Sequence, residues 1–307
     1  MDLLLNFTPK KPDKTINYLQ PMLFTGSCFA DEIALYMQQH NFNVVAQPFG
    51  TVFNPVSIAA QLERVINKQV YTANELVHRN ELFHSWEHHT QFTNTNKDIA
   101  LETINAHVIE AHQCLHHTNA VVWITLGSAF AYQYHGKIVA NCHKYPATDF
   151  SKKLLSVVEI TSALSKTIEQ LEGKQVVFTV SPVRHTRDGL VENNRSKSRL
   201  IEAVHQLTEY FPNVYYFPAY ELLIDVLRDY RFYAQDMVHP NSIAVKIVWE
   251  HLVNACFDEQ TQHFVTDMAK LLQMQQHKAL HPETEQYKKF IQALQLKENE
   301  LSQKYFR

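Results

Sequence analysis

The sequence of 307 residues has only six glycines, no long hydrophobic run and no excess of basic residues. A membrane-spanning helix needs about 20 consecutive apolar residues, so no membrane span is predicted. The 28 Lys and Arg residues against 31 Asp and Glu residues give a net charge of −3. Because nucleic-acid-binding proteins usually carry a basic excess or stripe, we expect no nucleic-acid partner. Residues 1–6 combine an acidic residue with three leucines, whereas a signal peptide begins with basic residues, so export is not predicted.

The sequence also lacks cysteine pairs with C-x-x-C spacing and the motifs that bind common cofactors. Its four cysteines are scattered, as reduced thiols of an intracellular protein are, so we expect a cytoplasmic location. Neither G-x-G-x-x-G nor a Walker A motif is present, so no nucleotide cofactor is predicted. His112 and His116 share one helix face, but a zinc site needs three or four converging ligands. The interpretation favoured here is a solvated helix surface, with no metal and no cofactor.

The composition, 45% hydrophobic and 19% charged residues, is that of an ordinary globular protein. Along the sequence, short apolar runs rich in β-forming residues alternate with longer stretches that have a helical pattern. The runs are short and continuously apolar, as in parallel strands buried on both faces. They lie at residues 22–26, 43–46, 120–126, 175–180 and 214–217. Helices are expected at about 30–39, 56–67, 97–117, 157–171, 196–210 and 242–256. This alternation predicts an α/β three-layer sandwich over residues 1–257, with a five-stranded parallel sheet in the order 2-1-3-4-5.

The C-terminal part, residues 258–307, has a different character. From 259 to 305 it contains no β-like run and no glycine, and Pro282 divides it into two charged, amphipathic stretches. We expect a helical C-terminal appendage that packs on the core or on a partner. If they pack on a partner, we expect that partner to be a second copy of this chain, so that the helices assemble a homo-oligomer.

The first predicted strand runs directly into a helix through Gly26, Ser27 and Cys28. In parallel sheets ligands bind outside the carboxyl ends of the strands, so this turn is a candidate site. A serine at the positive end of a helix dipole, among free N–H groups, suits a nucleophile. The alternative is that Ser27 only caps the helix. Cys28 is the rival nucleophile, but helical rotation by about 100° is expected to turn it toward the packing side.

A second candidate lies far downstream, in the loop before the last core helix. Asp236 and His239 are three residues apart, so the carboxylate can orient the imidazole. An activated serine needs a base within hydrogen-bond reach and an orienting group behind that base. Alone, the Asp-x-x-His pattern is more often a solvated loop. Together with Ser27 it predicts a catalytic triad.

Several stretches resemble one family. Residues 26–30 read G-S-C-F-A, the signature of the GSCFA family, and the chain resembles that family over about residues 20–255. Further matching stretches are 48–55, 140–144, 181–185, 228–234 and 236–241. The family in turn resembles the SGNH, or GDSL-like, hydrolases, which are flavodoxin-like α/β proteins that act as esterases and acyl-hydrolases. The resemblance implies a reaction class more directly than a substrate.

The resemblance implies roles for individual residues. Ser27 matches the nucleophile, and Asp236 and His239 match the Asp-x-x-His of the last conserved block of SGNH hydrolases. Gly50 matches the second-block glycine whose N–H group contributes to the oxyanion hole, and the Ser27 N–H is expected to contribute as well.

The third SGNH block departs from the pattern. SGNH hydrolases carry an asparagine two residues after a strand-end glycine, whereas Gly127 is followed by Ser128 and Ala129. Losing one oxyanion donor costs about 10²–10³ in rate, so another group is needed. Ser128 and Asn54 are the candidates.

Further polar residues follow the predicted strands. Arg184 and His185 stand at the end of the fourth strand, where an Arg can hold a carboxylate or phosphate of the substrate; the alternative is a contact with the following turn. His143 and Lys144 lie in a polar loop after residues 136–139, which predicts a lid or hairpin over the site; a solvated loop is the alternative.

These observations together predict a serine-dependent acyl-ester hydrolase that works through an acyl-enzyme on a small-molecule or glycan-linked acyl ester. Two alternatives stay open. One is an acyltransferase that uses the same acyl-enzyme. The other is a ligand-binding protein with weak or no turnover, which Ala129 favours.

Overall fold

The computed structural model describes residues 5–171 and 173–306. Residues 1–4, on which the expectation about export mainly depends, lie outside the described part. The central sheet has five strands in the order β2-β1-β5-β9-β10, and every pairing is parallel. The strands are β1 (Met22–Gly26), β2 (Val44–Ala46), β5 (Val121–Leu126), β9 (Gln175–Val180) and β10 (Val214–Tyr216). The predicted strand order is confirmed.

Each predicted helix is present. The core helices are α1 (Cys28–Gln39), α2 (Pro55–Ile66), α3 (Lys97–His116), α4 (Val157–Gln170), α5 (Leu190–Tyr210) and α7 (Ser242–Cys256). The largest difference is at α5, which begins six residues before the predicted start at 196. Its first turn exposes Leu190 and Val191, so no apolar face marks that start in the sequence. A short α6 (Ala219–Glu221) continues into a π-helical stretch, Leu222–Leu227.

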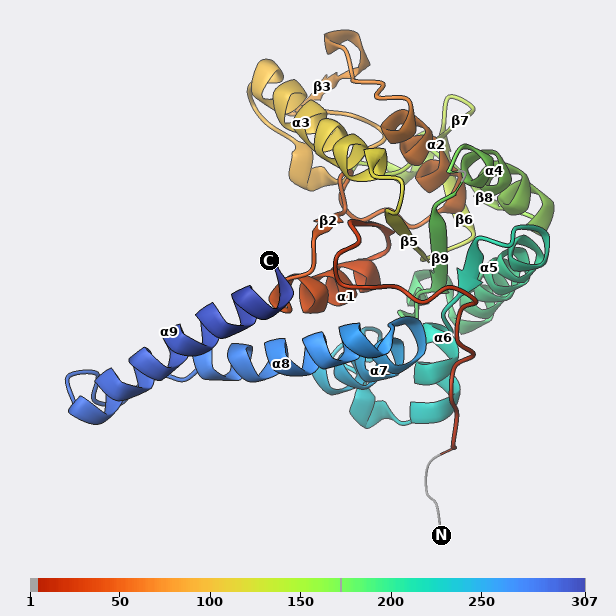
Figure 1. The fold of residues 1–307 in the computed structure, drawn as a ribbon. Coiled ribbons are helices and arrows are strands. Elements are labelled where there is room, and N and C mark those ends of the chain that lie inside the picture. The colour runs from red at the N-terminus through yellow and green to blue at the C-terminus, as the bar shows by residue number, and fades with distance from the viewer. Residues whose placement is uncertain (1–4, 172, 307) are drawn as a thin grey trace.

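The helices cover both faces of the sheet, which makes a three-layer sandwich (Figure 1). Along β5, Val122 and Ile124 pack in one core with α2, α3, α4 and α5. Val121 and Trp123 belong to the core on the other face, with α1 and α7. Every residue of β5 is buried, because side chains alternate between two covered faces.

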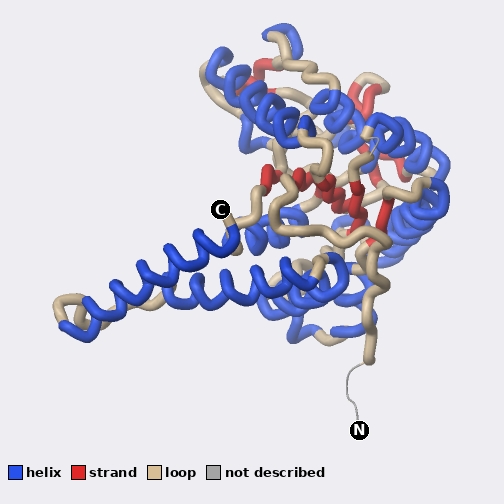
Figure 2. Tube along the Cα trace, viewed as in Figure 1, coloured by secondary structure: helices blue, strands red, loops and turns tan. Residues whose placement is uncertain are grey.

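Two small antiparallel sheets lie outside the central one (Figure 2). One pairs β3 (Val77–Arg79) with β4 (Leu82–His84). The other has the order β7-β6-β8, with β6 (Phe130–Tyr134), β7 (Lys137–Val139) and β8 (Ser151–Leu154). The β6–β7 pair is the predicted hairpin. The sequence did not predict β8, because its first three residues are polar and exposed.

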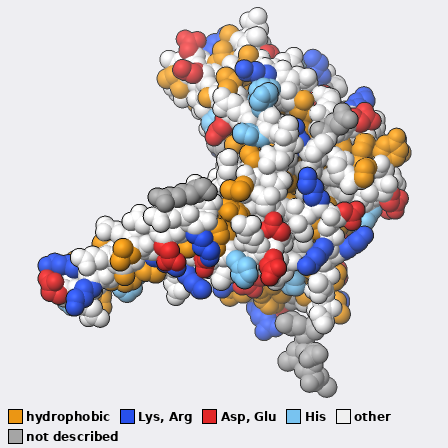
Figure 3. Space-filling view, in the orientation of Figure 1, with side chains coloured by type: hydrophobic (Ala, Val, Ile, Leu, Met, Phe, Trp, Pro, Cys, Tyr) orange, Lys and Arg blue, Asp and Glu red, His pale blue; other side chains and the backbone are white. Residues whose placement is uncertain are grey.

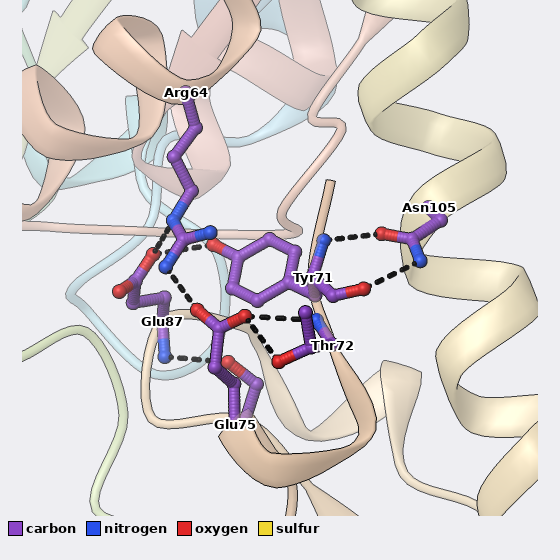
Figure 4. A network of polar contacts seen from close by, with 7 residues as sticks. Arg64, Tyr71, Thr72, Glu75, Glu87 and Asn105 are labelled. Atoms are coloured by element: carbon purple, nitrogen blue, oxygen red, sulfur yellow. Dashed lines mark hydrogen bonds and ion pairs between the residues drawn. The ribbon is translucent and has the colours of Figure 1, made fainter. Parts of the chain in front are cut away.

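A polar network fastens the segment between α2 and α3 to both helices (Figure 4). Tyr71 donates its N–H to Asn105 Oδ1 (2.7 Å) and accepts from Asn105 Nδ2 (3.0 Å). Arg64 on α2 pairs with Glu75 and, through Nε at 2.9 Å, with Glu87. Glu87 also accepts from the Tyr71 hydroxyl. The network thus holds Glu87 in place, two residues before His89.

The predicted C-terminal helices are α8 (Glu259–Gln275) and α9 (Glu285–Tyr305), joined through Pro282. They form a hairpin that extends from the body, and side chains of both charges surround its far end (Figures 1 and 3). Its near end packs on the body: Tyr18 stacks on Phe264 at 4.4 Å, and Leu301 and Tyr305 are buried. Within the described ranges, no helix is long and apolar enough to cross a membrane.

Candidate active site

A cavity of about 360 Å³ lies at the carboxyl edge of the central sheet. Loops that follow β1, β2 and β9 meet there with the loop before α7, as expected for the ligand site of a parallel sheet. Its walls are formed by Cys28, Thr51, Phe53, His89, Val183, Arg184, His185, Val238 and His239. Among the described residues, no group of three or more His, Cys, Asp or Glu side chains could hold a metal ion.

A larger cavity, of about 990 Å³, lies at the opposite end of the strands. It is formed by the N-terminal segment around Lys10 and by Gln175 and Val214, the first residues of β9 and β10. It contains none of the predicted site residues. The chemistry therefore concentrates at the smaller cavity, although the larger one offers more space.

Asp236 and His239 form a hydrogen-bonded pair at the smaller cavity. His239 Nδ1 lies 2.6 Å from Asp236 Oδ2, and Asp236 Oδ1 accepts from the N–H groups of His239 (3.0 Å) and Val238 (2.9 Å). The hydrogen bonds from the His239 N–H, the His239 ring and the Val238 N–H hold the pKa of Asp236 at about 2. The ionised carboxylate only accepts, so Nδ1 carries a proton, and Nε2 is the ring nitrogen that can act as a base. The structure thus brings together the predicted base and its orienting group.

Ser27 does not reach the cavity. It is 1% exposed, and its Oγ has no hydrogen-bond partner among the described residues. Its backbone is extended (ψ 169°), and its N–H donates to Thr125 O at 2.9 Å, so it continues the pairing of β1 with β5. The first residue that faces the cavity is Cys28, which is half-buried and begins α1. The expectation that Cys28 faces the packing side is therefore wrong, although α1 does begin at Cys28 with Ser27 at its N-cap.

The predicted oxyanion donors are also occupied. The Ser27 N–H belongs to the strand ladder, and the Gly50 N–H donates to Gln47 O at 2.8 Å. The next residue of each pair is different: the Thr51 N–H has no backbone acceptor among the described residues, and the Cys28 N–H contacts only the sulfur of its own side chain. Cys28 has no intrahelical acceptor because it stands in the first turn of α1. Cys28 and Thr51, each one residue after a predicted donor, line the cavity.

Gly26 and Gln47 hold the turn before Cys28. Gly26 has φ +129°, and a Cβ there would overlap the carbonyl oxygen of Thr125. The Gln47 side chain donates to the carbonyl oxygens of Gly26 and Ser27 (both 3.1 Å) and accepts from the Gly26 N–H (3.0 Å). Gln47 could not be predicted as a site residue, since no motif distinguishes it from a surface glutamine.

The candidates for the third oxyanion donor have structural roles and lie away from the cavity wall. The N–H groups of Gly127 and Ser128 both donate to Phe53 O at 3.0 Å. The Ser128 hydroxyl accepts from the Phe130 N–H (3.1 Å) and contacts Ser196 Oγ (3.3 Å). These contacts contradict the expectation that Gly127 and Ser128 face the substrate.

Asn54 and His143 are likewise engaged elsewhere. Asn54 caps α2, accepting from the Ser57 N–H at 2.8 Å and donating to Ser57 Oγ at 3.0 Å. His143 Nε2 is 2.8 Å from Ser85 O, and its ring lies 4.3 Å from that of His84. The predicted hairpin exists, but neither Asn54 nor His143 lines the cavity.

Arg184 and His185 do line the cavity, as predicted. The guanidinium carbon of Arg184 lies 4.3 Å from the centre of the Tyr233 ring, and the Arg184 N–H donates to Val238 O at 3.3 Å. Burial, and then the charge of Lys197, lower the pKa of His185 to about 4. At neutral pH the cavity therefore holds one fixed positive charge, on Arg184, beside a neutral His185.

Lys197, which sequence analysis missed, lies beneath the site. Its Nζ donates to Gly127 O (2.7 Å) and Ser181 O (2.6 Å), so it joins the ends of β5 and β9. It is 1% exposed, and burial lowers its pKa to about 7. A lysine in so polar a helix sequence is expected in solvent, and nothing in the sequence indicates otherwise.

Comparison with known proteins adds one match. The family model described as the GSCFA family matches residues 21–252, from the residue before β1 into α7. The matched range includes every residue of the cavity wall. No curated protein matches the chain.

Proposed function

The chain belongs to the GSCFA family, and we propose that its strand-end site is that of an acyl-ester hydrolase acting through an acyl-enzyme. One observation carries the proposal: the His239 ring, held by Asp236 at 2.6 Å, shares a cavity wall with Cys28, the first residue of α1, and with Thr51, and the N–H groups of both have no backbone acceptor. Base, nucleophile position and oxyanion donors are the three parts that acyl transfer needs.

The proposed reaction has two halves. A nucleophile from the turn at the start of α1 attacks the ester carbonyl carbon while His239 Nε2 accepts its proton. Asp236 stabilises the imidazolium, and the N–H groups of Cys28 and Thr51 donate to the oxyanion. The proton passes from His239 to the departing alkoxide, and water then releases the acyl group with His239 again as base. The sequence predicts the Ser27 hydroxyl as the attacking group, whereas the group on the cavity wall is the Cys28 thiol.

The cavity supports a short acyl group and an anionic substituent. Its volume of about 360 Å³ is near the lower end for small-molecule sites, which extend to about 1,000 Å³. Arg184 supplies a positive charge on the wall, and Arg pairs well with carboxylate and phosphate groups. We propose small or glycan-linked esters of this kind as substrates.

The test is a panel of p-nitrophenyl esters and acetylated sugars, assayed with the parent protein, His239→Ala and the exposed control His281→Ala. We expect hydrolysis by the parent and the control and a loss of about 10³-fold or more in His239→Ala. An acyltransferase would instead transfer the acyl group to an added alcohol or sugar, which product analysis distinguishes. If the folded parent neither hydrolyses nor transfers any acyl group, or if His239→Ala keeps full activity, the proposal is wrong.

A further inference from the structure

We propose that Cys28, and not Ser27, supplies the attacking atom, so that the site is a Cys-His-Asp acyl enzyme with a thioester intermediate. The inference rests on the proposed function and goes beyond it by naming the nucleophile. It follows from where the turn at the end of β1 directs its side chains.

Ser27 lacks the access that a nucleophile needs. Its side chain is buried between strand ends: a Cβ on Gly127 would lie 3.1 Å from Ser27 Cβ. Its carbonyl oxygen accepts from Gln47 Nε2 (3.1 Å) and from the Ala30 N–H (2.8 Å), and its N–H is bound to Thr125. Every backbone group of Ser27 is therefore engaged, and its buried side chain, 1% exposed, does not line the cavity.

Cys28 has both the access and the surroundings. Cys28 lines the cavity together with His239. The N–H groups of Cys28 and Thr51 have no backbone acceptor in another described residue, so oxyanion donors can start at the attacking residue itself. Because Cys28 begins α1, the helix dipole favours negative charge on its sulfur during the reaction.

Burial and the neighbouring charges set the resting state of the thiol. Burial, and then the nearby Asp31 carboxylate, raise the pKa of Cys28, and the contact with its own N–H and the positive charge of Lys197 only partly offset this. The resting enzyme therefore holds a neutral thiol. His239 must remove its proton during attack, which differs from a preformed thiolate–imidazolium pair.

The chemistry balances without any added reagent. The thiol proton goes to His239 Nε2 as sulfur bonds to the ester carbon and the carbonyl π electrons move to oxygen. Collapse of this oxyanion breaks the carbon–alkoxide bond, and the alkoxide takes the proton from His239. Water, deprotonated by His239, then attacks the thioester, and the returning proton restores the Cys28 thiol.

The first experiment locates the acyl group. The full chain is reacted with p-nitrophenyl acetate, quenched in acid and mapped by fragmentation mass spectrometry, in the parent, Ser27→Ala and Cys28→Ala. We expect acetylation at Cys28 that neutral hydroxylamine removes, as it does from a thioester. We expect the adduct to form in Ser27→Ala and to be lost in Cys28→Ala. Acetylation at Ser27, resistant to neutral hydroxylamine and retained in folded Cys28→Ala, would overturn the inference.

The second experiment is independent of ester turnover, so that it separates failure of the inference from failure of the proposed function. Cys28 is alkylated with iodoacetamide and compared within the same chain with Cys142, which is also half-buried but lies outside the cavity wall. Because the resting Cys28 thiol is neutral, we expect its alkylation to depend on His239 as base, so that His239→Ala slows Cys28 and leaves Cys142 unchanged. A Cys28 rate unchanged by His239→Ala would refute the role of Cys28 even if the protein hydrolyses esters. His239-dependent alkylation without ester hydrolysis would support Cys28 as an activated thiol and refute the ester substrate.

Discussion

The Asp236 carboxylate holds His239 with both of its oxygens. Oδ2 lies 2.6 Å from His239 Nδ1, while Oδ1 accepts from the backbone N–H of the same histidine at 3.0 Å. One side chain thus fixes the backbone turn and the ring together. The histidine side chain is nevertheless 49% exposed, so its orientation depends on this carboxylate rather than on packing.

Replacing Asp236 with Asn should therefore lower acyl transfer strongly while the protein stays folded. Asn can offer its NH₂ group to Nδ1, which favours the wrong tautomer of His239, so we expect a loss of about 10²–10⁴-fold in kcat/KM.

The pKa of Asp236, about 2, lies below the ordinary value of about 3.9. Its hydrogen bonds thus contribute stability above about pH 4, and this contribution is lost as pH falls toward 2. Urea unfolding at pH 7, 4 and 2.5 should show that acid-dependent loss in the parent and not in Asp236→Asn; equal acid sensitivity in both would contradict it.

Much of the fold could be predicted from the sequence, because both faces of the sheet are covered and its strands are continuously apolar. Val121–Leu126 is buried at every position and stands out as such. Strand β8 could not be predicted, because its residues Ser151, Lys152 and Lys153 are exposed and carry no pattern.

The sequence could predict the Asp236–His239 pair and the cavity residues Arg184 and His185, whereas Gly127, Ser128, Asn54 and His143 lie away from the cavity wall. Asp236 and His239 meet as expected, but the sequence cannot tell whether Ser27 ends the strand or begins the helix. Boundaries read from sequence are uncertain by one or two residues, and a shift of one residue turns a strand side chain to the other face. Gln47 and Lys197 were missed for another reason: their roles depend on burial by segments distant in sequence.

Lys197→Met should destabilise the protein. The change leaves the carbonyl oxygens of Gly127 and Ser181 without a buried donor, which costs about 1–3 kcal/mol each. The exposed control Lys246→Met should change the free energy of unfolding by less than about 0.5 kcal/mol. The two values are measured by urea unfolding at pH 7, and equal effects would show that Lys197 does not join the strand ends.

The same substitution should also change the pH dependence of stability. Burial lowers the pKa of Lys197 to about 7, whereas the unfolded chain keeps the ordinary value near 10.4. Between pH 7 and 10 the unfolded state binds more protons at this site, so this lysine makes stability rise with pH. The difference in unfolding free energy between parent and Lys197→Met should therefore grow in favour of the parent from pH 7 to 10. A constant or shrinking difference would mean that the pKa of Lys197 is not lowered.

Gly26→Ala should prevent the turn before Cys28 from forming. The added Cβ would overlap the carbonyl oxygen of Thr125, and φ +129° is unfavourable for any other residue. We expect a loss of more than about 3 kcal/mol of stability, or failure to fold. Gly136→Ala is the matched control: it also has positive φ (+79°), but nothing lies within 4 Å of the new Cβ, so about 1–2 kcal/mol is expected. Similar Tm values for the two variants would show that strand contact does not explain Gly26.

The last prediction concerns α9, which contributes to stability and not to the site. Deleting residues from 282 onward removes Leu301 and Tyr305, which are buried beside Phe264 in the core on the α1 and α7 face. The truncated chain should show a lower Tm and a greater tendency to aggregate, because the apolar side chains beneath α9 become exposed.

A point variant isolates the effect of α9. Leu301→Ala, at a position 1% exposed, should lower the free energy of unfolding by about 2–4 kcal/mol, whereas Leu296→Ala, at 70% exposed, should lower it by less than about 0.5 kcal/mol. Iodoacetamide labelling of Cys28, measured well below the Tm, should match the parent in both variants, because every residue of the cavity wall precedes α7. A folded Leu301→Ala protein whose Cys28 is alkylated more slowly than in the parent would show instead that the C-terminal helices complete the site.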